Sequence, residues 1–124
     1  MSKSTTTTKK KRPKKPRCLI FWITEEHRKM IEQIAAYRET ATAAEAVRHA
    51  LDHELRRGPT NERLMVAGPF TAQFCMEASD QDRALVESIK STRYVRTMSD
   101  ALRLAIEREA YAVRSERTAA RAKK

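Results

Sequence analysis

The stretch TEEHRKMIEQIAAYRETATAAEAVRHALDHE, residues 24–54, is matched without a gap by SDQDRALVESIKSTRYVRTMSDALRLAIERE, residues 79–109. The two stretches lie at a constant offset of 55 residues, and nine of their positions are identical. One helical pattern used twice predicts a pseudo-symmetric pair packed face to face, the arrangement that a homodimer reaches with two chains. The identical pairs are Arg28/Arg83, Glu32/Glu87, Ile34/Ile89, Arg38/Arg93, Thr42/Thr97, Ala46/Ala101, Arg48/Arg103, Ala50/Ala105 and Glu54/Glu109.

The size of the chain makes the two copies depend on each other. A chain of 124 residues and 14.3 kDa amounts to one domain. A unit of about 40 residues rarely buries an adequate core by itself. Two copies are also too few for a solenoid. We therefore expect one folded domain made from both copies.

The positive charge is concentrated at the two ends of the chain. The net charge is +10, yet residues 18–113 carry 13 Lys or Arg against 15 Asp or Glu. Residues 114–124 carry five bases and one acid, and residues 1–17 carry eight bases and no acid. A slightly acidic body with basic ends predicts a polyanionic partner. The bases that we assign to an N-terminal arm are Lys9, Lys10, Lys11, Arg12, Lys14, Lys15 and Arg17.

Several classes of protein are disfavoured by what the sequence lacks. No apolar run approaches the roughly 20 residues of a membrane span, and the N-terminus has no apolar stretch like that of a secretion signal. We expect a cytoplasmic bacterial protein that does not contact a membrane. Cys18 and Cys75 are too few for a disulfide scaffold and lack metal-ligand spacing.

The first copy predicts a strand followed by two helices. Residues 18–23 (CLIFWI) are β-branched and aromatic, which is typical of a strand. Thr24 is the expected N-cap of a first helix, with acids in its first turn. A break near residues 39–41 precedes Thr42-x-x-Glu45, a capping box that opens a second helix.

The second copy repeats this order after a connector, residues 56–70, in which Gly58-Pro59 ends the preceding helix. Residues 72–78 are the expected strand, Ser79 caps the next helix, and Thr97-x-x-Asp100 opens the last one. We divide the chain into a basic arm without regular structure (1–17), copy 1 (18–55), the linker (56–70), copy 2 (71–113) and a basic tail of fraying helix (114–124).

The double succession of strand, Thr- or Ser-capped helix and Thr-capped second helix resembles the ribbon-helix-helix family of DNA-binding proteins, in a tandem single-chain form. The resemblance covers residues 18–110. It implies a mainly α fold with a two-stranded antiparallel ribbon and an intramolecular pseudo-dimer. In that family the ribbon enters the major groove of DNA and the N-terminus of each second helix holds a phosphate.

The side chains of the ribbon can be assigned to two faces by alternation. If Leu19, Phe21 and Ile23 point into the core, their neighbours point outward, and the offset of 55 pairs Ile20 with Cys75. The outward face is unusual for the family, because it is mostly apolar with one carboxylate. Base contact and a protein partner both remain open for it. Its residues are Cys18, Ile20, Trp22, Gln73, Cys75 and Glu77.

The starts of the two second helices are the expected phosphate sites, because their first amides lack intrahelical acceptors. The alternative is that these threonines are caps and nothing more. The basic arm joins the first strand directly, which favours DNA contact over a solubilising tail, a membrane-surface patch or a nuclear-import signal. The residues at the helix starts are Thr42, Ala43, Ala44, Thr97, Met98 and Ser99.

Nothing in the sequence indicates catalysis or a cofactor. His49 and His53 have a spacing that can bind zinc, but Ala50 and Leu51 beside them belong to the core stripe, so a solvated helical face is expected there. His27 stands alone in this interpretation, and no partner is expected for it. We therefore expect a non-enzymatic protein without metal or cofactor.

The resemblance extends to a biological role. Among tandem members of the family, the chain is similar to accessory proteins of conjugative DNA processing and T-DNA transfer. This implies a monomer that binds double-stranded DNA near a transfer origin or border and assists a relaxase. Two alternatives stay open: a repressor or antitoxin of the same fold, and a protein-interaction module that does not use DNA.

Overall fold

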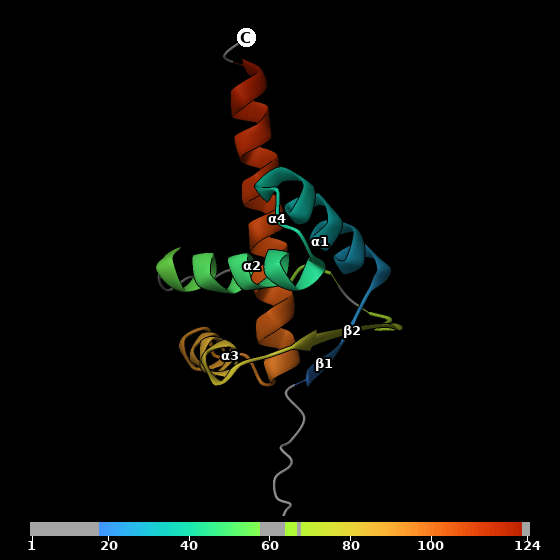
Figure 1. The fold of residues 1–124 in the computed structure, drawn as a ribbon, viewed down its shortest axis with the longest axis vertical. Helices are drawn as coiled ribbons and strands as arrows, with labels where there is room; N and C mark the ends of the chain where they lie inside the picture. The colour runs from blue at the N-terminus through green and yellow to red at the C-terminus, as the bar shows by residue number, and fades with distance from the viewer. Residues whose placement is uncertain (1–17, 58–63, 67, 123–124) are drawn as a thin grey trace, which may run out of the picture.

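A computed structural model of the protein describes residues 18–57, 64–66 and 68–122. Within these residues the chain is mainly helical, with one two-stranded antiparallel sheet. The sequence predicts both features. The basic arm and Gly58-Pro59 lie outside the described residues. The elements, shown in Figure 1, are β1 (Cys18–Ile23), α1 (Glu25–Arg38), α2 (Ala43–Arg57), β2 (Ala72–Glu77), α3 (Asp80–Thr92) and α4 (Met98–Ala122).

The register of the ribbon agrees with the prediction. Ile20 faces Cys75 across the strands, and the pairs on either side are Cys18 with Glu77 and Trp22 with Gln73. Phe21, Ile23, Ala72 and Met76 are buried, whereas all six side chains expected to point outward are exposed. The ribbon therefore covers the helices with one face and presents the other to solvent.

The first helix of each copy begins with the predicted cap. Thr24 Oγ1 accepts a hydrogen bond from the backbone N–H of His27, at 3.0 Å, and Ser79 Oγ accepts one from the N–H of Asp82, at 3.1 Å. Both side chains at the third helical position return a contact to the cap, so each is a reciprocal capping box.

His27 corrects an expectation, because it has partners at both ring nitrogens. Its Nδ1 lies 3.2 Å from the N–H of Thr24, which donates to it, and its Nε2 lies 2.7 Å from Glu107 Oε2. The carboxylate of Glu107 also accepts from the N–H groups of Met65 and Val66. Sequence spacing could not reveal this link, because the two side chains are 80 residues apart.

The first helix of each copy ends in a left-handed turn. Glu39 has φ 57° and Tyr94 has φ 56°, and these two residues are themselves 55 positions apart. A positive φ is uncommon for a residue with a Cβ atom, so its occurrence at matching positions is informative. The turns lead into α2 and α4 and account for the predicted break near residues 39–41.

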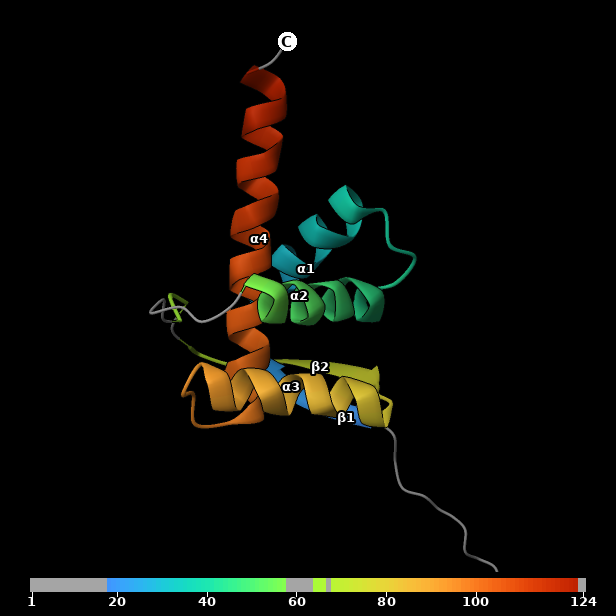
Figure 2. The same cartoon turned by 90° about the vertical axis from the view of Figure 1, so that its left-hand side faces the viewer.

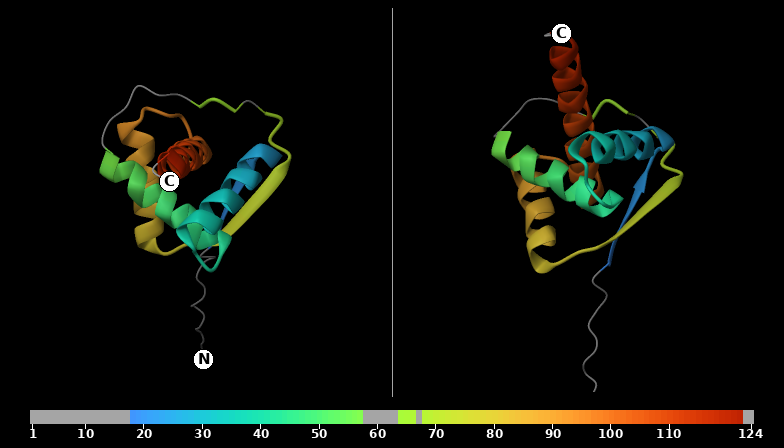
Figure 3. Two further views of the ribbon diagram at one scale, coloured as in Figure 1. Left: turned by 90° about the horizontal axis from the view of Figure 1, so that it is seen from above. Right: turned by 45° about the horizontal axis from the view of Figure 1, so that its top comes forward.

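The core lies around α4. Helices α1, α2 and α3 all pack on α4, and α2 also packs on α1 and α3. Figure 3, viewed from above, shows α4 nearly end-on with the other helices and the ribbon around it. Apolar side chains from all four helices are buried there, including Ile34, Leu51, Ile89, Leu102 and Ile106.

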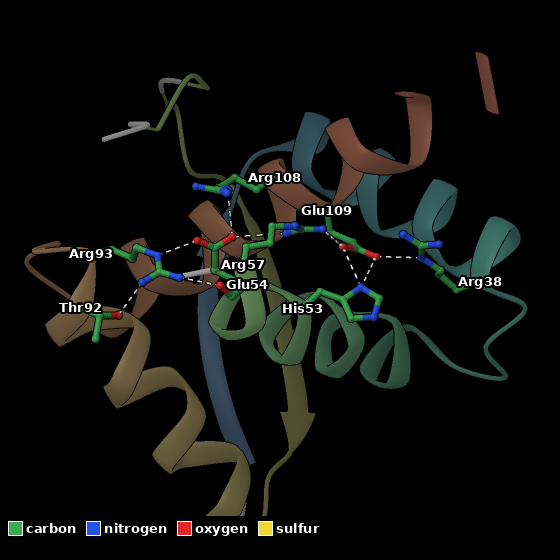
Figure 4. A network of polar contacts seen from close by, with 8 residues as sticks. All are labelled: Arg38, His53, Glu54, Arg57, Thr92, Arg93, Arg108 and Glu109. Atoms are coloured by element: carbon green, nitrogen blue, oxygen red, sulfur yellow. Dashed lines mark hydrogen bonds and ion pairs between the residues drawn. The ribbon is translucent and has the colours of Figure 1, made fainter. Parts of the chain in front are cut away.

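Two buried carboxylates connect the copies through reciprocal ion pairs (Figure 4). Arg93 in the second copy donates to Glu54 in the first, at 2.7 Å, and Arg38 in the first copy donates to Glu109 in the second, at 2.8 Å. Both carboxylates are fully buried. Arg57 also donates to Glu109.

The two copies differ most in the length of their second helices. Helix α2 ends at Arg57, whereas α4 continues to Ala122. The residues expected to form a basic helical tail therefore prolong α4 through residue 122. Figures 1 and 2 show this extension projecting from the end of the molecule opposite to the ribbon.

Candidate nucleic-acid interface

The outward face of the ribbon is a narrow, mostly apolar surface. Ile20 is 55% exposed and Trp22 is 49% exposed, although both are large apolar side chains. Gln73 lies opposite Trp22 and provides an amide, and Glu77 provides the single carboxylate. Glu77 can accept a hydrogen bond from the amino group of cytosine, and the apolar side chains can contact the methyl group of thymine.

Helices α2 and α4 are tied to opposite ends of this ribbon by equivalent arginines. Arg48 of α2 donates to the backbone carbonyl of Glu77, at 2.6 Å. Arg103 of α4 donates to the carbonyl of Trp22, at 2.8 Å. Since the strands are antiparallel, Glu77 and Trp22 lie toward opposite ends of the ribbon. The starts of the two helices therefore flank it.

The start of α2 differs in one detail from the predicted capping box. Thr42 Oγ1 accepts from the N–H of Glu45 at 3.1 Å, as expected. The Glu45 carboxylate, however, accepts from the N–H of Ala41 at 2.8 Å, instead of from that of Thr42. The N–H groups of Ala43 and Ala44 are in the first turn, where no intrahelical acceptor exists. They can donate to an anion.

The start of α4 has the same cap with different surroundings. Thr97 Oγ1 accepts from the N–H of Asp100 at 3.0 Å, and the Asp100 carboxylate binds Arg103 at 2.6 Å. Met98 and Ser99 occupy the first turn and are partly exposed. Arg96 is exposed just before this start, where the first copy has Ala41. The second helix start is therefore the more positive of the two.

Arg48 and Arg103 were not among the predicted site residues. Their identity at the offset of 55 was the available signal. Arg103 is buried beneath the ring of Phe70, with its guanidinium carbon 3.8 Å from the ring centroid. Arg48 is partly exposed beside a hollow of about 380 Å³ and also binds Asp82 at 3.1 Å. The two ends of the ribbon therefore differ in how far the equivalent arginine is exposed to solvent.

The two cysteines lie on the ribbon, and His49 and His53 lie on α2. Cys18 and Cys75 are free and exposed. The rings of His49 and His53 form an edge-to-face pair with centroids 5.6 Å apart. His53 corrects the expectation of a solvated face, because its Nδ1 lies 3.0 Å from Glu109 Oε2. Among the described residues, no cluster of three or more potential ligands could hold a metal.

Comparison of the chain with protein-family models, with curated proteins and with solved structures found no match. Within the described part of the chain, none of the helices has the length and apolar character needed to cross a membrane.

Proposed function

We propose that the protein is a tandem ribbon-helix-helix protein that binds double-stranded DNA as a monomer. The observation that carries the proposal is an exposed antiparallel ribbon flanked at both ends by helix starts. Ile20 and Cys75 pair at its centre, and the two flanking pairs are equivalent under the offset of 55. A ribbon of this kind fits the major groove, and the two helix starts fit the phosphates on either side.

Reciprocal contacts support an intramolecular pseudo-dimer. Each of the ion pairs Arg38–Glu109 and Arg93–Glu54 becomes the other when the two copies are exchanged. The same exchange converts the bond from Arg48 to Glu77 into the bond from Arg103 to Trp22. An isologous interface has this property, because residue i contacts j and j contacts i.

The proposed mode of binding separates affinity from sequence preference. The amides of the helix starts and the basic arm neutralise phosphates, which carry no sequence information. The outward side chains of the ribbon meet the base edges. Because those side chains differ between β1 and β2, the preferred duplex has two unequal half-sites.

A role as a non-enzymatic accessory protein of conjugative or T-DNA transfer, acting with a relaxase, is the part of the proposal that rests on sequence resemblance and on the basic ends. A repressor or antitoxin of the same fold is one alternative. A protein-interaction module is the other, and the exposure of Ile20 and Trp22 favours it, since large exposed apolar groups often mark partner contacts.

Selection of bound duplexes from a random library tests these functions together. We expect an asymmetric motif. A palindromic motif would favour the repressor, and failure to retain any duplex would leave the protein-interaction module.

The same selection with Trp22→Ala tests the ribbon, with Tyr111→Ala as the control. Tyr111 is also an exposed aromatic residue but lies on α4 away from the ribbon. Trp22→Ala should change the selected sequence and Tyr111→Ala should not. An unchanged motif for Trp22→Ala would contradict base contact by this face.

A further inference from the structure

The end of α4 is a basic surface remote from the ribbon. At 1.5 Å per residue, Arg114 and Arg121 lie about 24 and 35 Å along the helix axis from its start beside the ribbon. Figures 1 and 2 show the end of α4 projecting beyond the other helices, away from the ribbon. A duplex held on the ribbon is therefore at the far end of the molecule from these arginines.

The extension presents its arginines together. Arg114, Arg117 and Arg121 are exposed, and their spacing of three and four residues places them along one side of the helix. Arg117 also lines a hollow of about 630 Å³ with Lys29 of α1. Glu32 of α1 lines the same hollow, so the surface combines four cationic side chains and one carboxylate from two helices.

The single acid among residues 114–122 is already neutralised. Glu116 accepts two hydrogen bonds from the guanidinium of Arg38, at 2.8 and 3.1 Å. Arg38 thereby holds the pKa of the Glu116 carboxyl below its ordinary value. This ion pair also anchors the extension to α1. The arginines on the exposed side therefore keep their positive charge without a neighbouring counter-ion from this segment.

The composition of the extension favours a nucleic acid over a protein as its partner. Between residues 114 and 122 the only apolar side chains are those of alanines 119, 120 and 122. Protein interfaces depend on large buried anchors such as Trp, Tyr or Leu, and this segment offers none. Phosphate binding needs no such anchor. A slender helix with small side chains also fits the major groove, which is about 12 Å wide.

We propose that the end of α4 binds a second DNA duplex, so that one molecule bridges two duplexes. The inference rests on the proposed function, because the first duplex is the one held by the ribbon. Arg114, Arg117 and Arg121 contact phosphates of the second duplex, and Lys29 adds to the local positive potential.

Bridging can be measured with two duplexes of the same sequence. One is immobilised on beads and the other is fluorescent and free, and the full chain is added below the concentration of either. We expect wild-type protein to bring the fluorescent duplex to the beads. The triple variant R114Q/R117Q/R121Q should reduce this capture at least about tenfold while binding a single duplex within about threefold of wild type.

The matched control is R114K/R117K/R121K, which keeps the charge and should retain bridging. The salt dependence of bridging in the glutamine variant should fall by about 0.9 in logarithmic slope for each lost phosphate contact. Circular dichroism checks that α4 remains helical in all three proteins.

Four results would overturn the inference. Wild type that binds one duplex without bridging would refute it and leave the proposed function standing. Equal bridging by the glutamine variant would exclude the end of α4. Equal loss of single-duplex binding and bridging would make this surface part of the first site. If light scattering shows that the protein forms a dimer, and the dimer causes the capture, bridging would come from contact between two protein molecules. Wild type that binds no duplex at all would instead refute the proposed function.

Discussion

Glu54 and Glu109 show how individual charges specify the packing of the two copies. A buried carboxylate is costly unless cationic groups surround it. Glu54 has Arg93 and Arg108 within 2.9 Å, and both contacts come from the other copy. A packing that separated the copies would remove Arg38 and Arg57 from Glu109, and would leave Glu54 with Arg57 of its own helix at 3.4 Å. The ion pairs therefore disfavour alternative arrangements of helices whose apolar stripes are similar.

The ionisation of Glu109 links this network to pH. Burial by itself raises the pKa of the Glu109 carboxyl, but hydrogen bonds from Arg57 and Arg38 outweigh it and lower the pKa below the ordinary 4.5. A carboxyl with a lowered pKa in the folded state stabilises the fold above its unfolded pKa. That contribution is lost as the pH falls through the folded value.

Glu109→Gln should therefore destabilise the protein in a pH-dependent way. At pH 7 we expect the unfolding free energy to fall by about 3 kcal/mol. This value is at the low end of the range for breaking a buried ion pair, because Arg38 and Arg57 retain some contact with solvent. Below about pH 4.5 the difference from wild type should narrow, because the wild-type carboxyl becomes protonated as well. Urea unfolding at several pH values measures both effects.

Glu116→Gln is the control for this measurement, since Glu116 binds the same arginine at the surface. Its side chain is 47% exposed, so the loss should stay below about 1 kcal/mol. A loss for Glu109→Gln no larger than that for Glu116→Gln, or one that does not change with pH, would contradict the role assigned to the buried pair.

The ion-pair and hydrogen-bond partners of individual side chains could be predicted only in part from the sequence. The recurrence of Arg38/Arg93 and Glu54/Glu109 at one offset marked four charges on largely apolar helices, and this pattern could have suggested reciprocal ion pairs. The partners of His27 could not be predicted, because its contact with Glu107 depends on how α1 approaches α4. The matching positions in the other copy are Asp82 and Asp52, so the repeat gave no guide.

The threonine caps at the starts of α2 and α4 stabilise the helices and lie at the proposed phosphate sites. Thr42→Ala and Thr97→Ala each remove the side-chain acceptor for one N–H group in the first turn. Each should lower the unfolding free energy by about 1 kcal/mol. Each should also weaken binding to all duplexes by a similar factor, since phosphates carry no sequence information. Urea unfolding and fluorescence anisotropy with matched and unrelated duplexes provide the two measurements.

Thr24→Ala is the comparison for these caps, because it removes a similar cap from α1, whose start is not among the proposed phosphate sites. It should cost stability without changing DNA affinity in the folded protein. If Thr42→Ala and Thr97→Ala unfold more easily yet bind every duplex as wild type does, the two threonines are caps and nothing more.

The positions of the helices and strands could be predicted closely from the sequence, because several local sequence patterns indicated the same elements. Strand alternation, the offset of 55 and the Thr and Ser caps together predicted the faces and register of the ribbon. A fraying helical tail over residues 114–124 was predicted, but its continuity with α4 through residue 122 was not. Its continuation follows from the absence of Gly or Pro after residue 98, whereas Gly58 and Pro59 follow α2. The difference between the starts of α2 and α4 could not be predicted from the sequence. It depends on a contact in the folded protein, in which Phe70 of the linker packs on Arg103.

Across the whole molecule, charge is distributed unevenly between residues 18–113 and the two ends of the chain. Residues 18–113 are slightly acidic overall, so for the proposed DNA binding we expect long-range attraction to come from the basic ends. The arm precedes β1 in the sequence, whereas the extension of α4 lies at the end of the molecule opposite to the ribbon (Figure 1). Under the proposed function, we expect the ends of the chain to supply general affinity for DNA and the ribbon to supply sequence preference.

Deletion of residues 1–16 tests this division of roles. The segment holds seven bases and no acid, so its loss should weaken binding to every duplex alike. The slope of log affinity against log salt should fall by as much as about 6, at about 0.9 for each phosphate released. The unfolding free energy should change little, because the described core uses none of these residues. The control replaces the seven bases by glutamine at full length, which removes charge without shortening the chain. If both proteins keep the wild-type affinity and salt slope, the arm does not contact DNA, and the attraction has to come from the helix starts and the end of α4.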